Sequence, residues 1–143
     1  MARLRIQRTK LRYRGTAVVE AALVFPLLLL LTMGAIEYGW LFLKAQHMTN
    51  AARQGARLAI RPDVEIGGKE GVLALIERLM AEGGLADSGY IVNLTPDPTT
   101  VGTGNPLEVE IRVKSAGIVI IGASFLPVPE WLRATVTMTK EGP

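Results

Sequence analysis

Few residues of this chain could take part in chemistry. The sequence has no cysteine and a single histidine, His47, so a thiolate site, a histidine-based metal site or a Ser-His triad has too few residues to form. The nearest carboxylate pair, Glu108 and Glu110, lies on one face of a predicted strand, where cross-strand pairing with Arg133 or Lys140 explains it better than acid–base chemistry does. We therefore predict no enzyme activity, no metal and no cofactor.

The most informative spacing runs from Gly15 to Glu20. Six basic residues and no acid precede Gly15, and Glu20 is a single acid placed directly before an apolar run. An acid at the edge of a membrane helix is costly without a partner, so it is a candidate functional residue. Cleavage after Gly15 would leave a positive α-amine on Thr16, one helical turn from Glu20 and equally within reach of a neighbouring subunit's Glu20. The plainer interpretation makes Glu20 only the last polar residue before the membrane.

The apolar run is long enough to cross a bilayer. Residues 21–36 carry no charge, and residues 21–43 make a stretch of 23 residues. At about 1.5 Å per residue the longer stretch covers roughly 34 Å and the shorter one only about 24 Å, against a hydrocarbon core of about 30 Å. Basic residues gather before the run, which predicts a cytoplasmic N-terminus and an exported C-terminal part. A cleaved signal peptide is the rival, but the run is longer than a usual h-region and no clean cleavage site follows it.

Residues 12–60 resemble the TadE-like pseudopilins, minor prepilin-like proteins of the tight-adherence branch of the type IV pili. The resemblance is carried by the segments Arg14-Gly15, Val19-Glu20, Ala22-Leu23-Val24, Pro26 to Leu30, Gly34 to Gly39 and Asn50 to Arg57, and by a final strand at Leu132 to Met138. It implies cleavage after Gly15 by a membrane prepilin peptidase, and a role for Glu20 in recognition or assembly. It also implies pilins or pseudopilins as partners of the N-terminal helix. Ala21 stands where the major pilin of such systems has tyrosine, which argues against that role.

Three charged residues beyond the junction are candidate partner contacts. Glu37 lies near the outer end of the span, where it could reach headgroup water or pair with Lys44 or with a cation of a partner. Arg53 and Arg57 belong to a basic row at four-residue spacing that ends at Arg61. Such a row is either a solvated helix face or a contact with a partner subunit or with anionic headgroups.

These patterns divide the chain into a basic cytosolic leader (1–15), a transmembrane helix (16–43), its extension outside the membrane (44–61) and an exported head (62–143). In the head, apolar spacing predicts a helix over 69–82, closed by Gly83-Gly84. Strands are predicted at 90–95, 107–114 and 132–139, and residues 118–121 fit either a buried strand or a helical turn. The fold class is α+β: a long N-terminal helix, membrane-spanning in its first half, then one short helix and a three- to four-stranded antiparallel sheet.

The function predicted from these features is structural. The first hypothesis is a minor pseudopilin-like subunit in the cytoplasmic membrane, with its head outside, which either starts a pilus or enters it. The second is an uncleaved single-pass anchor whose head binds an envelope partner. The third is an exported enzyme, which the missing catalytic residues disfavour. Residues after Gly15 carry 10 basic and 13 acidic groups, so the basic pI belongs to the leader and does not indicate nucleic-acid binding.

Overall fold

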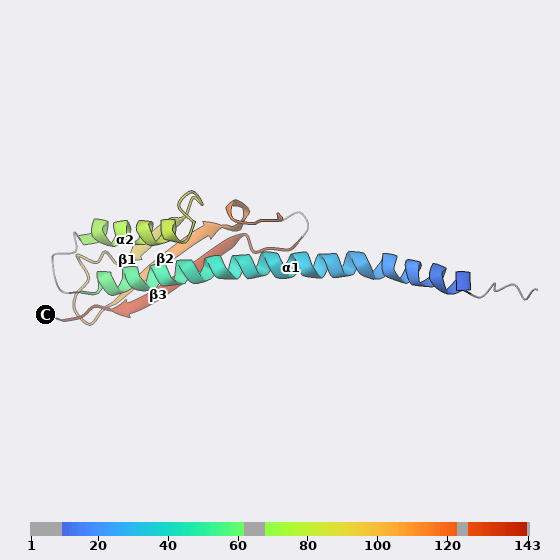
Figure 1. The fold of residues 1–143 in the computed structure, drawn as a ribbon. Helices are drawn as coiled ribbons and strands as arrows, with labels where there is room; N and C mark the ends of the chain where they lie inside the picture. The colour runs from blue at the N-terminus through green and yellow to red at the C-terminus, as the bar shows by residue number, and fades with distance from the viewer. Residues whose placement is uncertain (1–9, 62–67, 123–125, 143) are drawn as a thin grey trace, which may run out of the picture. The chain divides into compact units, whose positions relative to one another are not determined.

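The computed structural model describes residues 10–61, 68–122 and 126–142, with side chains from Gly15 onward. Most of the predicted leader therefore lies outside the described residues. The same holds for Pro62, where the sequence predicts that the long helix stops, and for Gly67, which begins a predicted Gly-Gly break in the chain. The chain forms two compact units, Met1–Ile36 and Glu37–Pro143. One long helix, α1 (Lys10–Ala59), contributes to both (Figure 1).

Helix α1 begins earlier than the predicted start at Thr16 and passes through Pro26 without interruption. Within the second unit, its buried side chains recur every three or four residues, which is the spacing of one helix face. This stripe, which we call the α1 stripe, consists of Glu37, Leu41, Lys44, Met48, Ala51, Ala52, Gly55, Ala56 and Ala59. Small residues fill its C-terminal half, so other elements can approach the backbone of α1 closely there.

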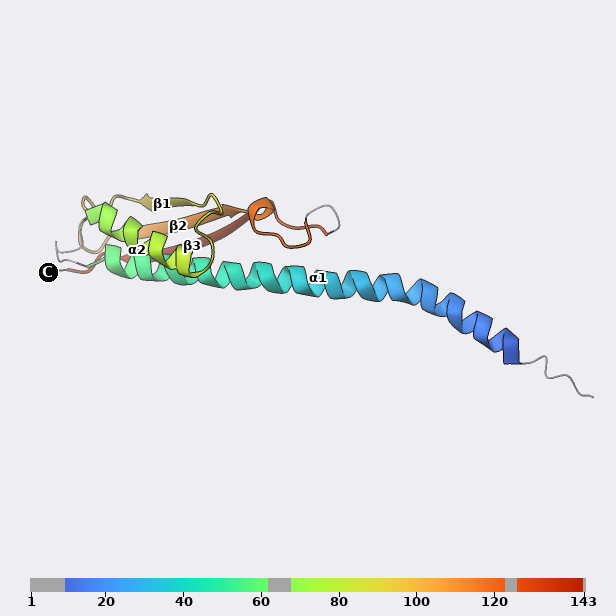
Figure 2. The ribbon, with the colours of Figure 1, turned by 45° about the horizontal axis from the view of Figure 1, so that its top comes forward.

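Helix α2 (Gly68–Glu82) lies against the C-terminal half of α1 (Figures 1 and 2). Its buried face is Val72, Ile76 and Met80, in agreement with the predicted amphipathic helix. The helix ends as predicted at Gly83-Gly84: Gly84 has a φ of +65°, and the N–H of Leu85 donates to the carbonyl of Met80. A left-handed residue of this kind is the usual stop of an α-helix and favours glycine.

The sheet has three antiparallel strands in the order β1 (Ile91–Thr95), β2 (Pro106–Lys114) and β3 (Trp131–Thr139). The strict alternation of β2 buries Leu107, Val109, Ile111 and Val113 completely. These side chains meet those of α1 and α2, so both helices cover one face of the sheet, which Figure 2 shows from a second side. The predicted α+β class is confirmed, with three strands.

Residues 118–121 differ from both sequence interpretations. A short 3-10 helix, η2 (Ser115–Gly117), ends β2, and residues 118–121 then form a turn and bends without pairing to the sheet. This stretch begins a connection from β2 to β3 that is closed at its base, where the N–H of Ser115 donates to the carbonyl of Glu130 over 3.0 Å. Its residues are held by side chains of α1 instead of by a strand.

Candidate functional site

The predicted processing junction lies on an exposed stretch of α1. Gly15, Thr16 and Glu20 all fall within the helix and are all exposed. Thr16 and Glu20 are four residues apart and therefore share a helix face, as the sequence predicted. A Cβ added to Gly15 would meet nothing within 4 Å. The junction is thus open to another protein, while the roles of these residues stay predictions.

The helix after Glu20 exposes apolar side chains on every side. In the described part of the first unit, the large apolar side chains from Val18 to Leu31 are exposed, with Leu23 at 75%. The helix from Gly15 to Ala59 contains a window long and apolar enough to cross a membrane, of which only 6% is buried within the structure. The core helix of a soluble protein would be mostly covered. The Thr32 hydroxyl donates to the Leu28 carbonyl over 2.8 Å, so this polar group is satisfied within the helix.

Glu37 has partners that neither sequence interpretation named. Its side chain is fully buried, and its two carboxylate oxygens accept the N–H groups of Ile120 (3.1 Å) and Ile121 (2.7 Å). The carboxylate therefore binds two consecutive backbone donors of the connection between β2 and β3. Hydrogen bonds to a charged acceptor are stronger than those between neutral groups, and two of them offset part of the cost of burying the charge.

Two aromatic side chains of α1 hold the same connection. The Trp40 indole N–H donates to the carbonyl of Ile118 over 2.8 Å, and the Tyr38 hydroxyl donates to the carbonyl of Pro127. We call Glu37, Tyr38 and Trp40 the loop latch. These three helix residues bind backbone groups that the sheet leaves unpaired.

The sequence suggested Lys44 as a partner of Glu37, but in the structure Lys44 caps the C-terminal end of α2. Its ammonium donates to the carbonyls of Gly83 (2.8 Å) and Gly84 (3.3 Å) and lies 4.3 Å from the centre of the Trp40 ring. A cation at the C-terminus of a helix interacts favourably with the helix dipole and with the free carbonyls of the last turn. Lys44 thereby couples α1 to α2 at the end of the head that holds the loop latch.

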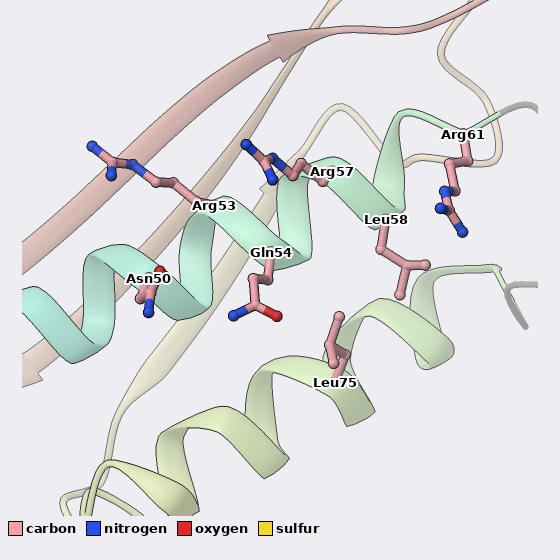
Figure 3. A pocket seen from close by; sticks show the side chains of 7 residues that line it. All are labelled: Asn50, Arg53, Gln54, Arg57, Leu58, Arg61 and Leu75. Carbon is pink, nitrogen blue, oxygen red and sulfur yellow. The ribbon is translucent and has the colours of Figure 1, made fainter.

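The predicted basic row lines an open cleft of about 450 Å³ between α1 and α2 (Figure 3). Arg53, Arg57 and Arg61 are all exposed, and none forms an ion pair with another residue of the described chain. Figure 3 also shows Gln54 and Leu75 between the two helices. A neutral amide and three free guanidinium groups are suited to an anionic partner.

Of the two carboxylates on β2, Glu110 forms ion pairs. Glu110 Oε1 lies 2.9 Å from Arg112 Nε and 3.0 Å from Arg133 Nε, while Glu108 faces Thr137 across the strands. The guanidinium of Arg112 holds the pKa of the Glu110 carboxyl below its ordinary value, and hydrogen bonding from Asn93 acts in the same direction. Lys140 binds carbonyls of Ala59, Arg61 and Pro98 instead, so of the two predicted partners only Arg133 pairs with Glu110.

Among the described residues, no group of three or more His, Asp or Glu side chains comes together in a way that could hold a metal ion. His47, the single histidine, packs beside Gly83, whose added Cβ would lie 3.1 Å from the His47 Cβ.

The sequence did carry a signal for the roles of Glu37 and Lys44. In the sequence, small and apolar residues recur at intervals of three and four from Ala59 back to Met48, and the same intervals continue through Lys44 and Leu41 to Glu37. A charged residue on the buried face of a helix must find an internal partner. Extending the pattern would have placed both residues on the α1 stripe.

The fold defines the class of the protein: a long N-terminal helix with an exposed apolar stretch that continues into a small α+β head. Residues 15–57 match the model of the TadE-like protein family, which confirms the resemblance for that segment. The matched segment lies within the helix that contains a window long and apolar enough to cross a membrane. Neither the curated proteins nor the solved structures include a significant match to the chain.

Proposed function

We propose that this chain is a minor pseudopilin-like subunit of a tight-adherence pilus, cut by a prepilin peptidase between Gly15 and Thr16. The match to the TadE-like family over residues 15–57 is the observation that carries the proposal. The leader and the cut lie on the cytoplasmic side of the membrane, and the head lies outside. The head holds the subunit at the outer surface, while the N-terminal helix makes the contacts with other pilins or pseudopilins.

Glu20 acts after cleavage in this proposal. The new α-amine of Thr16 is cationic at neutral pH and lies one helical turn from the carboxylate of Glu20. In a bundle of such helices the carboxylate can instead bind the amine of a neighbour, which fixes how far one helix is shifted along the next. The exposure of Glu20 in the single chain supports this use. A carboxylate at a membrane edge is costly without a partner, so pairing with a neighbour's amine would favour formation of the bundle.

The test is Glu20→Ala in cells that assemble the pilus, with Glu108→Ala as the control. Glu108 is an exposed acid on a strand of the head, so its loss changes charge without touching the N-terminal helix. We expect Glu20→Ala to abolish or strongly reduce pilus assembly while the subunit still reaches the membrane. Crosslinks between its N-terminal helix and a pilin should be lost in parallel. Normal pilus assembly in the Glu20→Ala variant would contradict the proposal.

The second candidate function is an uncleaved membrane anchor whose head binds an anionic envelope partner. The cleft lined by Arg53, Arg57 and Arg61 favours it, because its guanidinium groups are exposed and without ion pairs in the described chain. In this alternative, residues 1–15 remain attached and the cleft carries the function. The length of the mature chain separates the two candidates.

A further inference from the structure

The C-terminal part of α1 presents an exposed cationic surface. No acid follows the loop latch on this helix, and Arg53, Arg57 and Arg61 recur at intervals of four residues. The cleft beside them has an apolar floor, where Leu58 of α1 and Leu75 of α2 point toward each other (Figure 3). We call these five residues the basic cleft. A partner for it needs carboxylates that reach the arginines and uncharged side chains that cover the leucines.

Helix α2 carries an exposed acidic surface on another side from the one that lines the basic cleft. Its residues, which we call the acidic ridge, recur at intervals of four, three and four and share one side of the helix: Glu70, Ala74, Glu77 and Ala81. Among the described residues neither Glu70 nor Glu77 forms an ion pair, whereas Glu82 of the same helix pairs with Arg78. The ridge therefore offers two free carboxylates separated by small side chains.

The basic cleft and the acidic ridge lie at the same level of the head. Gly55 of α1 packs against Ile76 in the middle of α2, and Lys44 binds the carbonyl of Gly83 after the end of α2. Helix α2 therefore runs antiparallel to α1, side by side with it (Figures 1 and 2). The two charged surfaces occupy the same stretch of this helix pair.

The charges of the two surfaces also match in spacing. Arg53 and Glu77 both lie near the packed middle of the helix pair; Arg61 comes eight residues after Arg53, and Glu70 seven residues before Glu77. At about 1.5 Å per residue these separations are roughly 12 Å and roughly 10 Å. If two heads stand side by side and point the same way, Arg53 of one faces Glu77 of the other. The antiparallel course of α2 then brings Arg61 opposite Glu70.

We propose that the basic cleft of one chain binds the acidic ridge of a second copy, so that heads pack side by side in a row. Single exposed ion pairs contribute little, so burial of Ala74 against Leu58 and Leu75 adds to the binding. Because the two surfaces differ, the contact is heterologous, and a bound pair keeps one free cleft and one free ridge for further copies. The inference goes beyond the proposed function, because it requires neither cleavage nor Glu20.

The test uses the native absence of cysteine. Two full-length copies with different tags, one with Gln54→Cys beside the basic cleft and one with Ala74→Cys on the acidic ridge, are reconstituted together in phosphatidylcholine vesicles and treated with a short thiol crosslinker. We expect residue 54 to crosslink with residue 74 far more than with residue 54 of another copy. Thr135→Cys, on the exposed side of β3, is the control and should give only background.

Charge reversal tests the pairing itself. Arg53→Glu in the first copy, or Glu77→Arg in the second, should lower the yield of the 54–74 crosslink about tenfold, because like charges then face each other. The two reversals combined should restore the yield. Glu108→Arg reverses another exposed acid of the head and is the matched control, which should leave the yield unchanged.

Three results would overturn the inference. A dominant crosslink between two copies of residue 54 would mean that the clefts face each other. A 54–74 yield no higher than that of residue 135 would mean that the heads do not meet at these surfaces. A yield that the combined reversals fail to restore would mean that Arg53 and Glu77 do not pair. None of these results bears on cleavage after Gly15, and an uncut chain would leave the inference standing.

Discussion

The contacts of Glu37 show how a carboxylate can be fully buried in a small head without a charged partner. Both oxygens accept backbone N–H groups from consecutive residues, so each oxygen of the carboxylate has a hydrogen-bond donor. The arrangement also serves the loop, because Ile120 and Ile121 lie outside the strands and would otherwise have no acceptor there. These two hydrogen bonds therefore satisfy both the buried carboxylate of Glu37 and the backbone N–H groups that it binds.

Replacing this carboxylate by the amide should loosen the loop selectively. In Glu37→Gln, one oxygen still accepts an N–H, but the amide nitrogen faces a second donor and leaves it unbound. A buried unsatisfied donor costs about 1–3 kcal/mol. We expect faster amide hydrogen exchange in peptides covering residues 118–122, measured by mass spectrometry in detergent. Glu108→Gln, an exposed change in the same head, is the control and should leave that exchange unchanged. Equal protection in Glu37→Gln and the native chain would contradict the role of the latch.

The residue roles were less predictable from sequence than the elements. The spacing from Gly15 to Glu20 and the basic row at Arg53 and Arg57 are visible in the sequence as charges at regular intervals. The latch is not visible in this way, because its partners are backbone N–H and C=O groups about 80 residues away in the sequence. Only the backward extension of the α1 stripe hinted that Glu37 faces inward.

At the scale of secondary-structure elements, the helices and strands with a strong hydrophobic periodicity in the sequence were predicted correctly. The alternation in β2 and the three-and-four spacing in α2 each bury one face against a common core, so local pattern and tertiary packing agree. Residues 118–121 were ambiguous because a short apolar run fits a strand or a helical turn equally well. The conformation of this stretch depends on hydrogen bonds to side chains of α1. Contacts between residues so distant in the sequence cannot be deduced from a local sequence pattern.

The contact between α1 and α2 depends on a missing side chain at Gly55. A Cβ there would lie 2.6 Å from Ile76 Cδ1 and 2.8 Å from its Cγ1, and Ile76 is fully buried. Overpacking of this kind costs about 1–3 kcal/mol, which exceeds the gain of about 0.5–1 kcal/mol from placing alanine in a helix. We therefore expect Gly55→Ala to lower the unfolding temperature of the detergent-solubilised protein.

The matched control for this prediction is Gly39→Ala. Gly39 lies on the same helix and is exposed, and an added Cβ would meet nothing within 4 Å. The unfolding temperature of the Gly39→Ala variant should stay the same or rise slightly, because only the helix propensity of this residue changes. A Gly55→Ala variant as stable as Gly39→Ala would show that α2 does not pack against α1 as closely as the structure has it.

At the scale of the whole molecule, α1 serves two units with different surroundings. Its first part exposes apolar side chains as a membrane span requires, and its second part buries a stripe of small residues under α2 and the sheet. Compact packing begins at Glu37, so residues 37–43, which the sequence assigned to the span, also carry contacts to the head. The division into leader, span, extension and head remains a prediction in its exact boundaries.

The account's central claim is that a prepilin peptidase removes residues 1–15, and the intact mass of the membrane-extracted protein tests it most directly. The mass and the N-terminal sequence should be measured from cells with and without the peptidase. We predict a chain that begins at Thr16 when the peptidase is present and at Met1 when it is absent. A chain that begins at Met1 in both strains would contradict the claim and favour a plain membrane anchor. A start near Glu37 would contradict it in another way, by making residues 1–36 an ordinary signal peptide.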